Sequence, residues 1–224
     1  MKVVILAGGR GTRISEETES VPKPMVSVGG RPMLWHIMKV YSHYGFNDFI
    51  ICLGYKGYVI KEYFANYFLH SADISIDLCR NKMQIIGSKA EAWKVTLIDT
   101  GLDTATGGRI KKIQKYTQGK TFMLTYGDGV GDINLKKALS FHRKHGKVAT
   151  ITAVQTTGRF GALNIGEGGQ IKSFFEKPKG DGAWINGGFF ILQPEVFDYI
   201  PGEDVFFEKE PLENIVKDNQ LKAY

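Results

Sequence analysis

The fold follows from one stretch near the start of the chain, Val3-Val4-Ile5-Leu6-Ala7-Gly8-Gly9-Arg10-Gly11-Thr12-Arg13. An apolar run of strand-forming residues ends in three glycines, which let backbone approach a ligand closely and let its N–H groups form a concave anion nest. Arg13 and Lys23, the latter held between Pro22 and Pro24, add positive charge for phosphate oxygens. The stretch predicts a buried strand and a loop that binds nucleotide phosphates. The alternative is a tight turn that needs glycine for its geometry alone.

Two common phosphate-binding motifs do not fit this loop. A Rossmann fingerprint, G-x-G-x-x-G, fails because Ile14 stands where the third glycine is needed. A P-loop, G-x-x-x-x-G-K-[ST], fails at Gly119-Lys120-Thr121, because Gln114 occupies the first glycine position and a strand follows instead of preceding. The sequence therefore predicts a phosphate loop of a different type.

Composition and charge narrow the class of protein. The chain has 224 residues, 43% of them hydrophobic, which suits one large domain with a substantial core. Its net charge of +6 is scattered, and the densest basic run, 109–115, reads equally well as a solvated helix face, so we expect no nucleic-acid partner. The sequence lacks a run of about 18 apolar residues and a signal peptide, so we expect no membrane partner and a cytoplasmic protein. Cys52 and Cys79 lie in apolar runs without metal spacing and are expected to be reduced and buried.

Strand-like and helical patterns alternate along the chain. This alternation predicts an α/β fold: a doubly wound, mostly parallel (mixed) open sheet in a single domain. Three glycine-bearing loops, 7–13, 101–109 and 127–131, follow strands, and ligands bind at the carboxyl ends of strands in such folds. A β-hairpin is predicted over 161–165 and 170–175, whereas residues 80–94 show no clear period and are interpreted as an insertion used in assembly. Strands are predicted at 2–6, 48–53, 74–79, 95–100, 121–125 and 148–154, and helices at 32–44, 60–67, 110–116 and 135–142.

Several of these motifs together resemble a known family. Residues 6–13 with Pro22-Lys23-Pro24-Met25 resemble the signature of sugar-1-phosphate nucleotidylyltransferases. Tyr126-Gly127-Asp128 resembles the metal-aspartate motif of that family, and Phe175-Glu176-Lys177-Pro178 resembles its sugar-site motif. The motifs occur in the family's order and span almost the entire chain. The resemblance implies a Rossmann-like nucleotidyltransferase fold, with a nucleotide-binding part over about 1–130 and a sugar-binding part, including the hairpin extension, over about 131–224.

Two further segments point to one branch of the family. Ile98-Asp99-Thr100-Gly101-Leu102-Asp103-Thr104-Ala105-Thr106-Gly107-Gly108-Arg109 and Trp184-Ile185-Asn186-Gly187-Gly188-Phe189-Phe190 are most similar to members that transfer a cytidylyl group. The glutamine that tends to mark thymidylyl- and uridylyl-transferring relatives is missing between Gly101 and Arg109. The resemblance implies CTP and α-D-glucose 1-phosphate as substrates of a homo-oligomeric enzyme of deoxysugar and O-antigen biosynthesis. A thymidylyl- or uridylyl-transferring relative, or a non-catalytic sugar-nucleotide-binding module, remains the alternative.

The same resemblance assigns roles to individual residues. In-line attack of a sugar phosphate on an α-phosphorus needs positioning and charge neutralisation but no protein nucleophile. Catalysis is assigned to Arg13 on the leaving pyrophosphate, to Lys23 on the phosphates and to Asp128 as the ligand of Mg²⁺. The sugar phosphate is assigned to Glu176, Lys177 and Asn186. The nucleotide site comprises Leu6, Ala7, Gly8, Gly9, Arg10, Gly11, Thr12, Arg13, Lys23, Thr104, Arg109 and Gly127.

Other candidate ligands receive structural interpretations. Asp132 rivals Asp128 as a metal ligand, but it precedes a predicted helix and is interpreted as its N-cap. His142 and His145 are one helical turn apart without a third ligand nearby, and are interpreted as structural or solvated. The family's second metal carboxylate is expected beyond Tyr224, so no second ligand is named.

Overall fold

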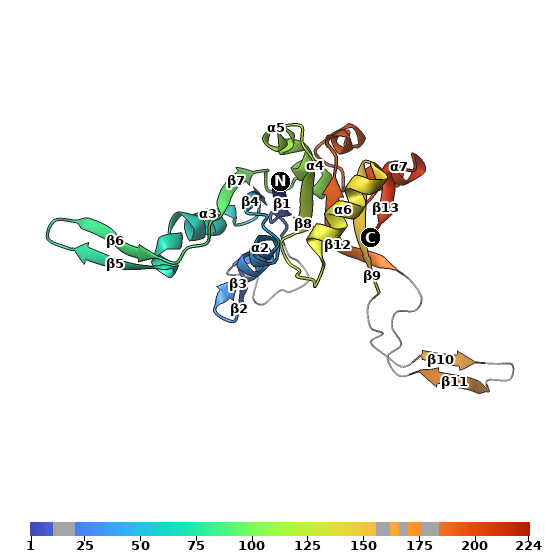
Figure 1. Ribbon diagram of the computed structural model, residues 1–224, viewed down its shortest axis with the longest axis horizontal. Coiled ribbons are helices and arrows are strands. Elements are labelled where there is room, and N and C mark those ends of the chain that lie inside the picture. Colours follow the sequence, from blue (N-terminus) through green and yellow to red (C-terminus); the bar gives the residue numbers. More distant parts are fainter. Residues whose placement is uncertain (11–20, 156–161, 166–169, 176–183) are drawn as a thin grey trace.

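The computed structural model describes residues 1–10, 21–155, 162–165, 170–175 and 184–224. Its centre is a seven-stranded sheet in the order β13-β9-β12-β8-β1-β4-β7 (Figure 1). In this sheet β12 is antiparallel to both of its neighbours, and the other pairings are parallel, which confirms the predicted mixed sheet. The strands are β1 (Lys2–Leu6), β4 (Asp48–Leu53), β7 (Lys94–Asp99), β8 (Phe122–Tyr126), β9 (Ala149–Val154), β12 (Ile185–Leu192) and β13 (Leu221–Ala223).

The first strand lies at the centre of the molecule. Val4 pairs with Ile50 of β4 on one side and with Leu124 of β8 on the other, and all three side chains are buried. Helices α2 (Met33–His43), α3 (Gly57–Ala65) and α6 (Leu135–His145) pack on one face of the sheet. Helices α4 (Thr106–Lys112), η4 (Pro194–Tyr199) and α7 (Glu210–Lys217) pack on the other. The apolar run is thus a strand covered on both faces, as a doubly wound fold requires.

Helix α6 follows the predicted pattern but begins at a different cap. Its buried positions include Leu135, Ala138, Leu139 and His142, which repeat at helical spacing. The N-cap is Asn134, whose side-chain oxygen accepts a hydrogen bond from the backbone N–H of Lys137 at 3.0 Å. The expectation that Asp132 caps this helix is therefore wrong, because the helix starts two residues further along and a closer amide takes the position.

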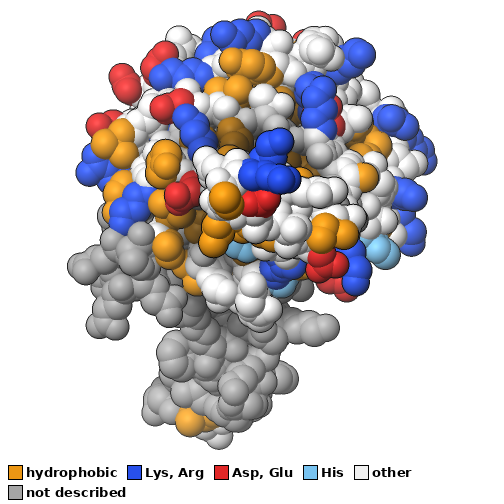
Figure 2. Space-filling model, turned by 90° about the vertical axis from the view of Figure 1, so that its left-hand side faces the viewer, with side chains coloured by type: hydrophobic (Ala, Val, Ile, Leu, Met, Phe, Trp, Pro, Cys, Tyr) orange, Lys and Arg blue, Asp and Glu red, His pale blue; other side chains and the backbone are white. Residues whose placement is uncertain are grey.

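The segment interpreted as an irregular insertion contains a strand. β6 (Lys82–Ser88) pairs antiparallel with β5 (Ala72–Asp77) in a hairpin that extends away from the central sheet (Figure 1). Figure 2, viewed from the side on which this hairpin lies, shows hydrophobic side chains interspersed with lysine and arginine. Cys52 is buried in β4 as expected, but Cys79 lies in the hairpin turn and is exposed, which corrects the prediction for that residue. Nothing covers the turn, since the hairpin lies outside the layered core among the described residues.

The smaller elements complete the described chain. β10 (Ala162–Ile165) and β11 (Ile171–Phe175) form the predicted antiparallel hairpin, and β2 (Ser27–Val28) pairs with β3 (Arg31–Pro32). Short helices occur at η1 (Lys23–Met25), η2 (Tyr67–His70) and α5 (Gln114–Thr117). Within the described ranges, the helices lack the length and apolar character needed to span a bilayer.

Candidate active site

A cavity of about 340 Å³ opens at the carboxyl ends of β1 and β8, at the edge of the sheet where the glycine loops were expected to meet. Most of the predicted nucleotide-site residues within the described ranges line it, together with Asp128. These are Leu6, Ala7, Gly8, Gly9, Lys23, Thr104, Arg109, Gly127 and Asp128. The cavity is further lined by Pro24, Ala105, Thr106, Tyr126 and Phe206, none of which was among the predicted site residues.

Backbone hydrogen bonds join the residue after β1 to β4 and the residue after β8 to β1, next to the cavity. The N–H of Ala7 donates to the carbonyl oxygen of Cys52 at 3.0 Å, and the N–H of Gly127 donates to that of Leu6 at 2.9 Å. A Cβ at position 127 would lie 2.9 Å from the Leu6 carbonyl oxygen and 3.0 Å from a ring carbon of Pro24. Glycine is required there because the backbones of the loops after β1 and β8 meet without room for a side chain.

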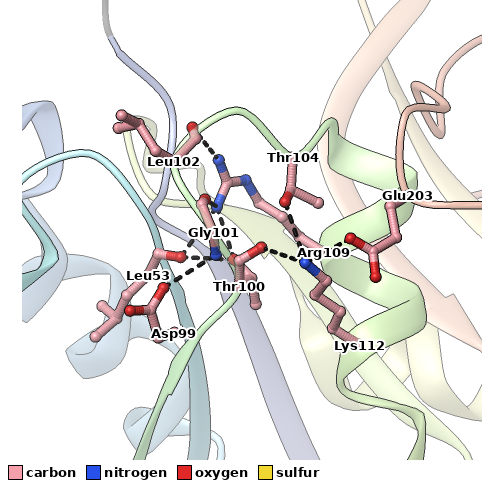
Figure 3. Close-up of polar contacts among 9 residues, drawn as sticks. All are labelled: Leu53, Asp99, Thr100, Gly101, Leu102, Thr104, Arg109, Lys112 and Glu203. Atoms are coloured by element: carbon pink, nitrogen blue, oxygen red, sulfur yellow. Dashed lines mark hydrogen bonds and ion pairs between the residues drawn. The ribbon is translucent and has the colours of Figure 1, made fainter.

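Arg109 links these loops through hydrogen bonds of its side chain (Figure 3). Its buried guanidinium donates through Nη1 to the carbonyl oxygens of Leu53 and Gly101 and to the hydroxyl of Thr100, at 3.0, 2.8 and 2.6 Å. Nη2 donates to the carbonyl oxygens of Gly8 and Leu102 at 3.0 and 3.2 Å. Burial lowers the pKa of Arg109, and nearby groups, including the Asp99 and Asp103 carboxylates, oppose this shift. Arg109 thus lies in the cavity wall, but the donors of its Nη1 and Nη2 atoms are engaged by protein oxygens.

A lysine and a surface ion pair fix the loop after β7. Lys112 Nζ donates to the carbonyl oxygen of Thr100 at 3.1 Å and to the hydroxyl of Thr104 at 3.3 Å, and it pairs with a carboxylate oxygen of Glu203 at 2.7 Å (Figure 3). Arg10, a predicted nucleotide ligand, does not line the cavity; its guanidinium pairs with the exposed Asp103 carboxylate at 2.5 Å. The Lys112 contact holds Thr104 at the cavity wall, and the Arg10–Asp103 ion pair fixes the residue that precedes it.

The segment 203–208 forms a wall of the site that the sequence analysis missed. The N–H of Gly107 donates to the carbonyl oxygen of Val205 at 2.8 Å, and a Cβ on Gly108 would lie 2.0 Å from the Glu203 carbonyl oxygen. Phe206 faces the cavity. These contacts join residues about 100 positions apart, so a local pattern in the sequence cannot predict them. The one available signal was the pair Gly107-Gly108 itself, which indicates close approach of another backbone.

Tyr126 lies between the cavity and β12. Burial raises the pKa of Tyr126, and the Glu208 carboxylate that accepts a hydrogen bond from its hydroxyl raises it further. A hydrogen bond with the side chain of Asn186 acts in the opposite direction. Asn186, predicted to bind the sugar phosphate, is exposed at the start of β12 and lies beside Tyr126 instead of lining the cavity.

Five predicted ligands lie outside the described residues, so their roles stay predictions: Gly11, Thr12, Arg13, Glu176 and Lys177. Asp128 is exposed where it lines the cavity, whereas Asp132 lines a separate groove with His36 and His43. Among the described residues, no three metal-ligating side chains cluster together. A single carboxylate lining a cavity of about 340 Å³ nevertheless suits Mg²⁺, which takes one or two carboxylates and completes its shell with water and phosphate oxygens.

The two histidines of α6 are structural, as expected. His142 is fully buried, with Nδ1 2.7 Å from the hydroxyl of Thr150 and Nε2 3.0 Å from the side-chain nitrogen of Gln193. His145 Nε2 lies 2.7 Å from the same Thr150 hydroxyl. Burial lowers the pKa of His142 to about 4, so the ring is neutral at physiological pH.

Comparison with known proteins agrees with this geometry. The family model described as nucleotidyl transferase matches residues 2–221. The chain belongs to this family. It is 56% identical to a glucose-1-phosphate cytidylyltransferase of Salmonella typhi, over all of this chain and 87% of that protein. It is 48% identical to a probable glucose-1-phosphate cytidylyltransferase of Bacillus subtilis, with the same coverage.

A solved structure of the same architecture contains a nucleotide analogue. HddC from Yersinia pseudotuberculosis, solved in complex with GMP-PN, superimposes with a TM-score of 0.69 at 26% identity. The match covers all of this chain and 89% of that protein. The expected Rossmann-like nucleotidyltransferase fold is thereby confirmed.

Proposed function

We propose that this nucleotidyl transferase moves the cytidylyl group of CTP onto α-D-glucose 1-phosphate, giving CDP-glucose and pyrophosphate. One observation carries the proposal: Gly8, Gly9, Lys23 and Asp128 line a single cavity in a chain that is 56% identical, along its whole length, to a glucose-1-phosphate cytidylyltransferase. The setting that we propose is cytoplasmic synthesis of the deoxysugars of O-antigens.

The cavity supplies what in-line phosphoryl chemistry needs. A phosphate oxygen of glucose 1-phosphate attacks the α-phosphorus of CTP, the bond to the β-phosphate oxygen breaks, and pyrophosphate leaves. Lys23 is half-buried in the wall and places a positive charge against the phosphates, where a low local dielectric strengthens the attraction. Asp128 would hold Mg²⁺, which supplies further neutralisation of phosphate charge when bound.

Other residues are proposed to position the two substrates. The backbone of residues 6–9 approaches the nucleoside closely because two of these residues are glycine, and Thr104 presents a hydroxyl to it. Arg13 is proposed to hold the pyrophosphate, and Glu176, Lys177 and Asn186 the sugar phosphate, on the family resemblance of their motifs. Arg109 acts on the nucleotide through the loop carbonyls that it fixes.

The assay that tests this function measures pyrophosphate release with glucose 1-phosphate and CTP, UTP, dTTP or ATP, with and without Mg²⁺. We expect kcat/KM for CTP to exceed that for each other nucleotide by about tenfold or more, because a site that hydrogen-bonds one base leaves polar groups unpaired with another. Faster release with dTTP or UTP would assign the chain to another branch of the family. No metal-dependent release with any nucleotide would support a non-catalytic binding module.

We further propose that the chain forms a homo-oligomer through the β5–β6 hairpin. Ile76, Met83 and Ile85 are each more than half exposed. Ile76 pairs directly with Met83, and Ile85 lies two residues further along β6 on the same face. An apolar face on a projecting hairpin is costly in water and is stabilised when a second copy covers it.

A further inference from the structure

One carboxylate outside the cavity lining connects two of the cavity's walls. The Tyr126 hydroxyl donates to Glu208 Oε1 at 2.6 Å, and the Thr106 hydroxyl donates to Glu208 Oε2 at 2.6 Å. Tyr126 and Thr106 both line the cavity, whereas Glu208 lies behind them and is half-buried. Each oxygen of the carboxylate therefore accepts a short hydrogen bond from a different element of the fold.

The two hydroxyls lie at the ends of the two loops that carry Asp128 and Thr104. Tyr126 is the last residue of β8 and stands two positions before Asp128. Thr106 is the first residue of α4 and stands two positions after Thr104. A displacement of the Glu208 carboxylate consequently shifts the loop that carries Asp128 relative to the loop that lines the nucleotide cavity.

The surroundings require an acceptor at both oxygens. The backbone N–H of Phe207 donates to the Thr106 hydroxyl oxygen at 2.9 Å, so the proton of that hydroxyl is directed to Glu208. The ring of Tyr126 is fixed from its other side, since a Cβ on Gly188 would lie 3.1 Å from its Cδ2 atom. A neutral amide offers only one acceptor oxygen and would present N–H groups to the second hydroxyl.

We propose that Glu208 is a positioning residue: through Tyr126 and Thr106, its carboxylate fixes the Asp128 loop relative to the nucleotide-binding loop. The proposal rests on the nucleotidyl-transfer function proposed above. It assigns Glu208 no contact with either substrate. Glu208 affects how the phosphates, the sugar and the metal-binding carboxylate are aligned. Because alignment of the reacting groups lowers the barrier of the chemical step, its loss lowers kcat.

The test is a double-variant cycle on the full chain, with Glu208→Gln, Tyr126→Phe and their combination. Wild-type protein is first assayed with the four nucleotides, and each variant is then measured with the nucleotide that wild type uses best. We expect Glu208→Gln to lower kcat about 10- to 100-fold while KM for both substrates changes less than about threefold. The kcat of the double variant should lie within about threefold of that of Glu208→Gln alone, because the Tyr126 hydroxyl acts through the same carboxylate.

The matched control is Glu210→Gln, which removes an exposed carboxylate two positions further along the chain, at the first residue of α7, and should leave kcat unchanged. Tyr126→Phe keeps the packed ring and removes only the hydroxyl. It therefore tests the hydrogen bond to Glu208 even if Glu208→Gln fails to fold. A kcat within about twofold of wild type in Tyr126→Phe, or multiplicative losses in the combination, would overturn the proposal. A nucleotide preference other than CTP in wild type overturns the cytidylyl assignment and leaves the positioning role to be decided by the cycle.

Discussion

The Nη2 atom of Arg109 donates to the carbonyl oxygen of Gly8 at 3.0 Å, across 101 residues of chain. A Cβ at position 8 would lie 2.1 Å from the Nη1 atom of the same guanidinium. The glycine loop after β1 and the arginine of α4 therefore define each other's position. In this chain the geometry of the cavity is set by a buried cation as much as by the glycines that line it.

Arg109→Lys should destabilise the protein, because one ammonium cannot replace donors that reach five separate oxygens. Leaving several buried acceptors unpaired is expected to lower the free energy of unfolding by about 3 kcal/mol. Urea denaturation followed by circular dichroism measures this. The control, Lys115→Met, changes an exposed lysine on the next helix and should shift stability by less than about 0.5 kcal/mol. A loss below about 1 kcal/mol in Arg109→Lys would show that the guanidinium is dispensable.

Gly108→Ala tests the wall formed by residues 203–208. The added methyl group would lie 2.0 Å from the backbone oxygen of Glu203, so α4 must move away from that segment. We expect a loss of about 2 kcal/mol in the free energy of unfolding, since overpacking against backbone forces the elements apart. Gly202→Ala is the matched control: its Cβ meets no atom within 4 Å, and its stability should equal that of wild type. Equal stability of both variants would contradict the close approach.

Much of the fold was predictable because its signals are local. The apolar run of β1 and the helical spacing of Leu34, Ile37, Met38 and Tyr41 each depend on neighbouring residues, and the structure confirms both. Lys23, Asp128 and the glycine loops could be placed in one site because parallel strands bring their carboxyl ends to one edge. Glu208 could not, since its contacts with Thr106 and Tyr126 span 102 and 82 residues.

The strand β6 was missed for a different reason. Met83 and Ile85 alternate with polar residues, as Ile74 and Ile76 do in β5, but this alternation is too short to have been recognised as a period. Ile86 breaks the pattern because the register shifts beside it, so that one extra residue interrupts the alternation. In the sequence alone, a bulge of this kind hides the two-residue periodicity of the strand.

His142 makes the protein sensitive to mild acid. Burial lowers its folded-state pKa to about 4, with His145 and Arg143 adding to the shift, whereas a histidine in the unfolded chain titrates near 6.5. Between these values the unfolded chain binds a proton that the folded chain does not. The stability is thus fully present above pH 6.5 and is lost as the pH falls toward 4, by up to about 1.4 kcal/mol per pH unit.

His142→Gln isolates this contribution. The amide can still pair with Thr150 and Gln193 but carries no titrating proton. Urea unfolding is measured at several pH values between 7 and 4. As the pH falls, the free energy of unfolding should decrease less steeply in the variant than in wild type. Identical slopes would show that another group is responsible, and His145, whose pKa is also lowered by burial, would be the next residue to replace.

Substitution of the hairpin face should change the assembly state. In Met83→Lys/Ile85→Lys, two like charges replace exposed apolar side chains, and a second copy could no longer cover them without burying both ammonium groups. Light scattering after size exclusion should show wild type as an oligomer and the double variant as a folded monomer. Gln84→Lys, on the opposite face of β6, should keep the wild-type mass. An unchanged mass in the double variant, or a monomeric wild type, would contradict assembly through this hairpin.

Asp128 and Asp132 are two exposed carboxylates four residues apart. Asp128 lines the cavity at the ends of β1 and β8, whereas Asp132 lines a separate groove, so the two residues can be compared directly. Asp128→Asn should reduce kcat about 100-fold or more, since a neutral amide holds Mg²⁺ more weakly than a carboxylate and the phosphates then lose the neutralising charge of the metal. Its unfolding midpoint should stay at the wild-type value because the side chain is exposed. Wild-type activity should disappear with EDTA and return with excess Mg²⁺, and Asp132→Asn should behave as wild type in both respects. If Asp132→Asn lost activity while Asp128→Asn kept it, the metal-binding role would pass to Asp132, and the cavity at the ends of β1 and β8 would lose its assignment as the reaction site.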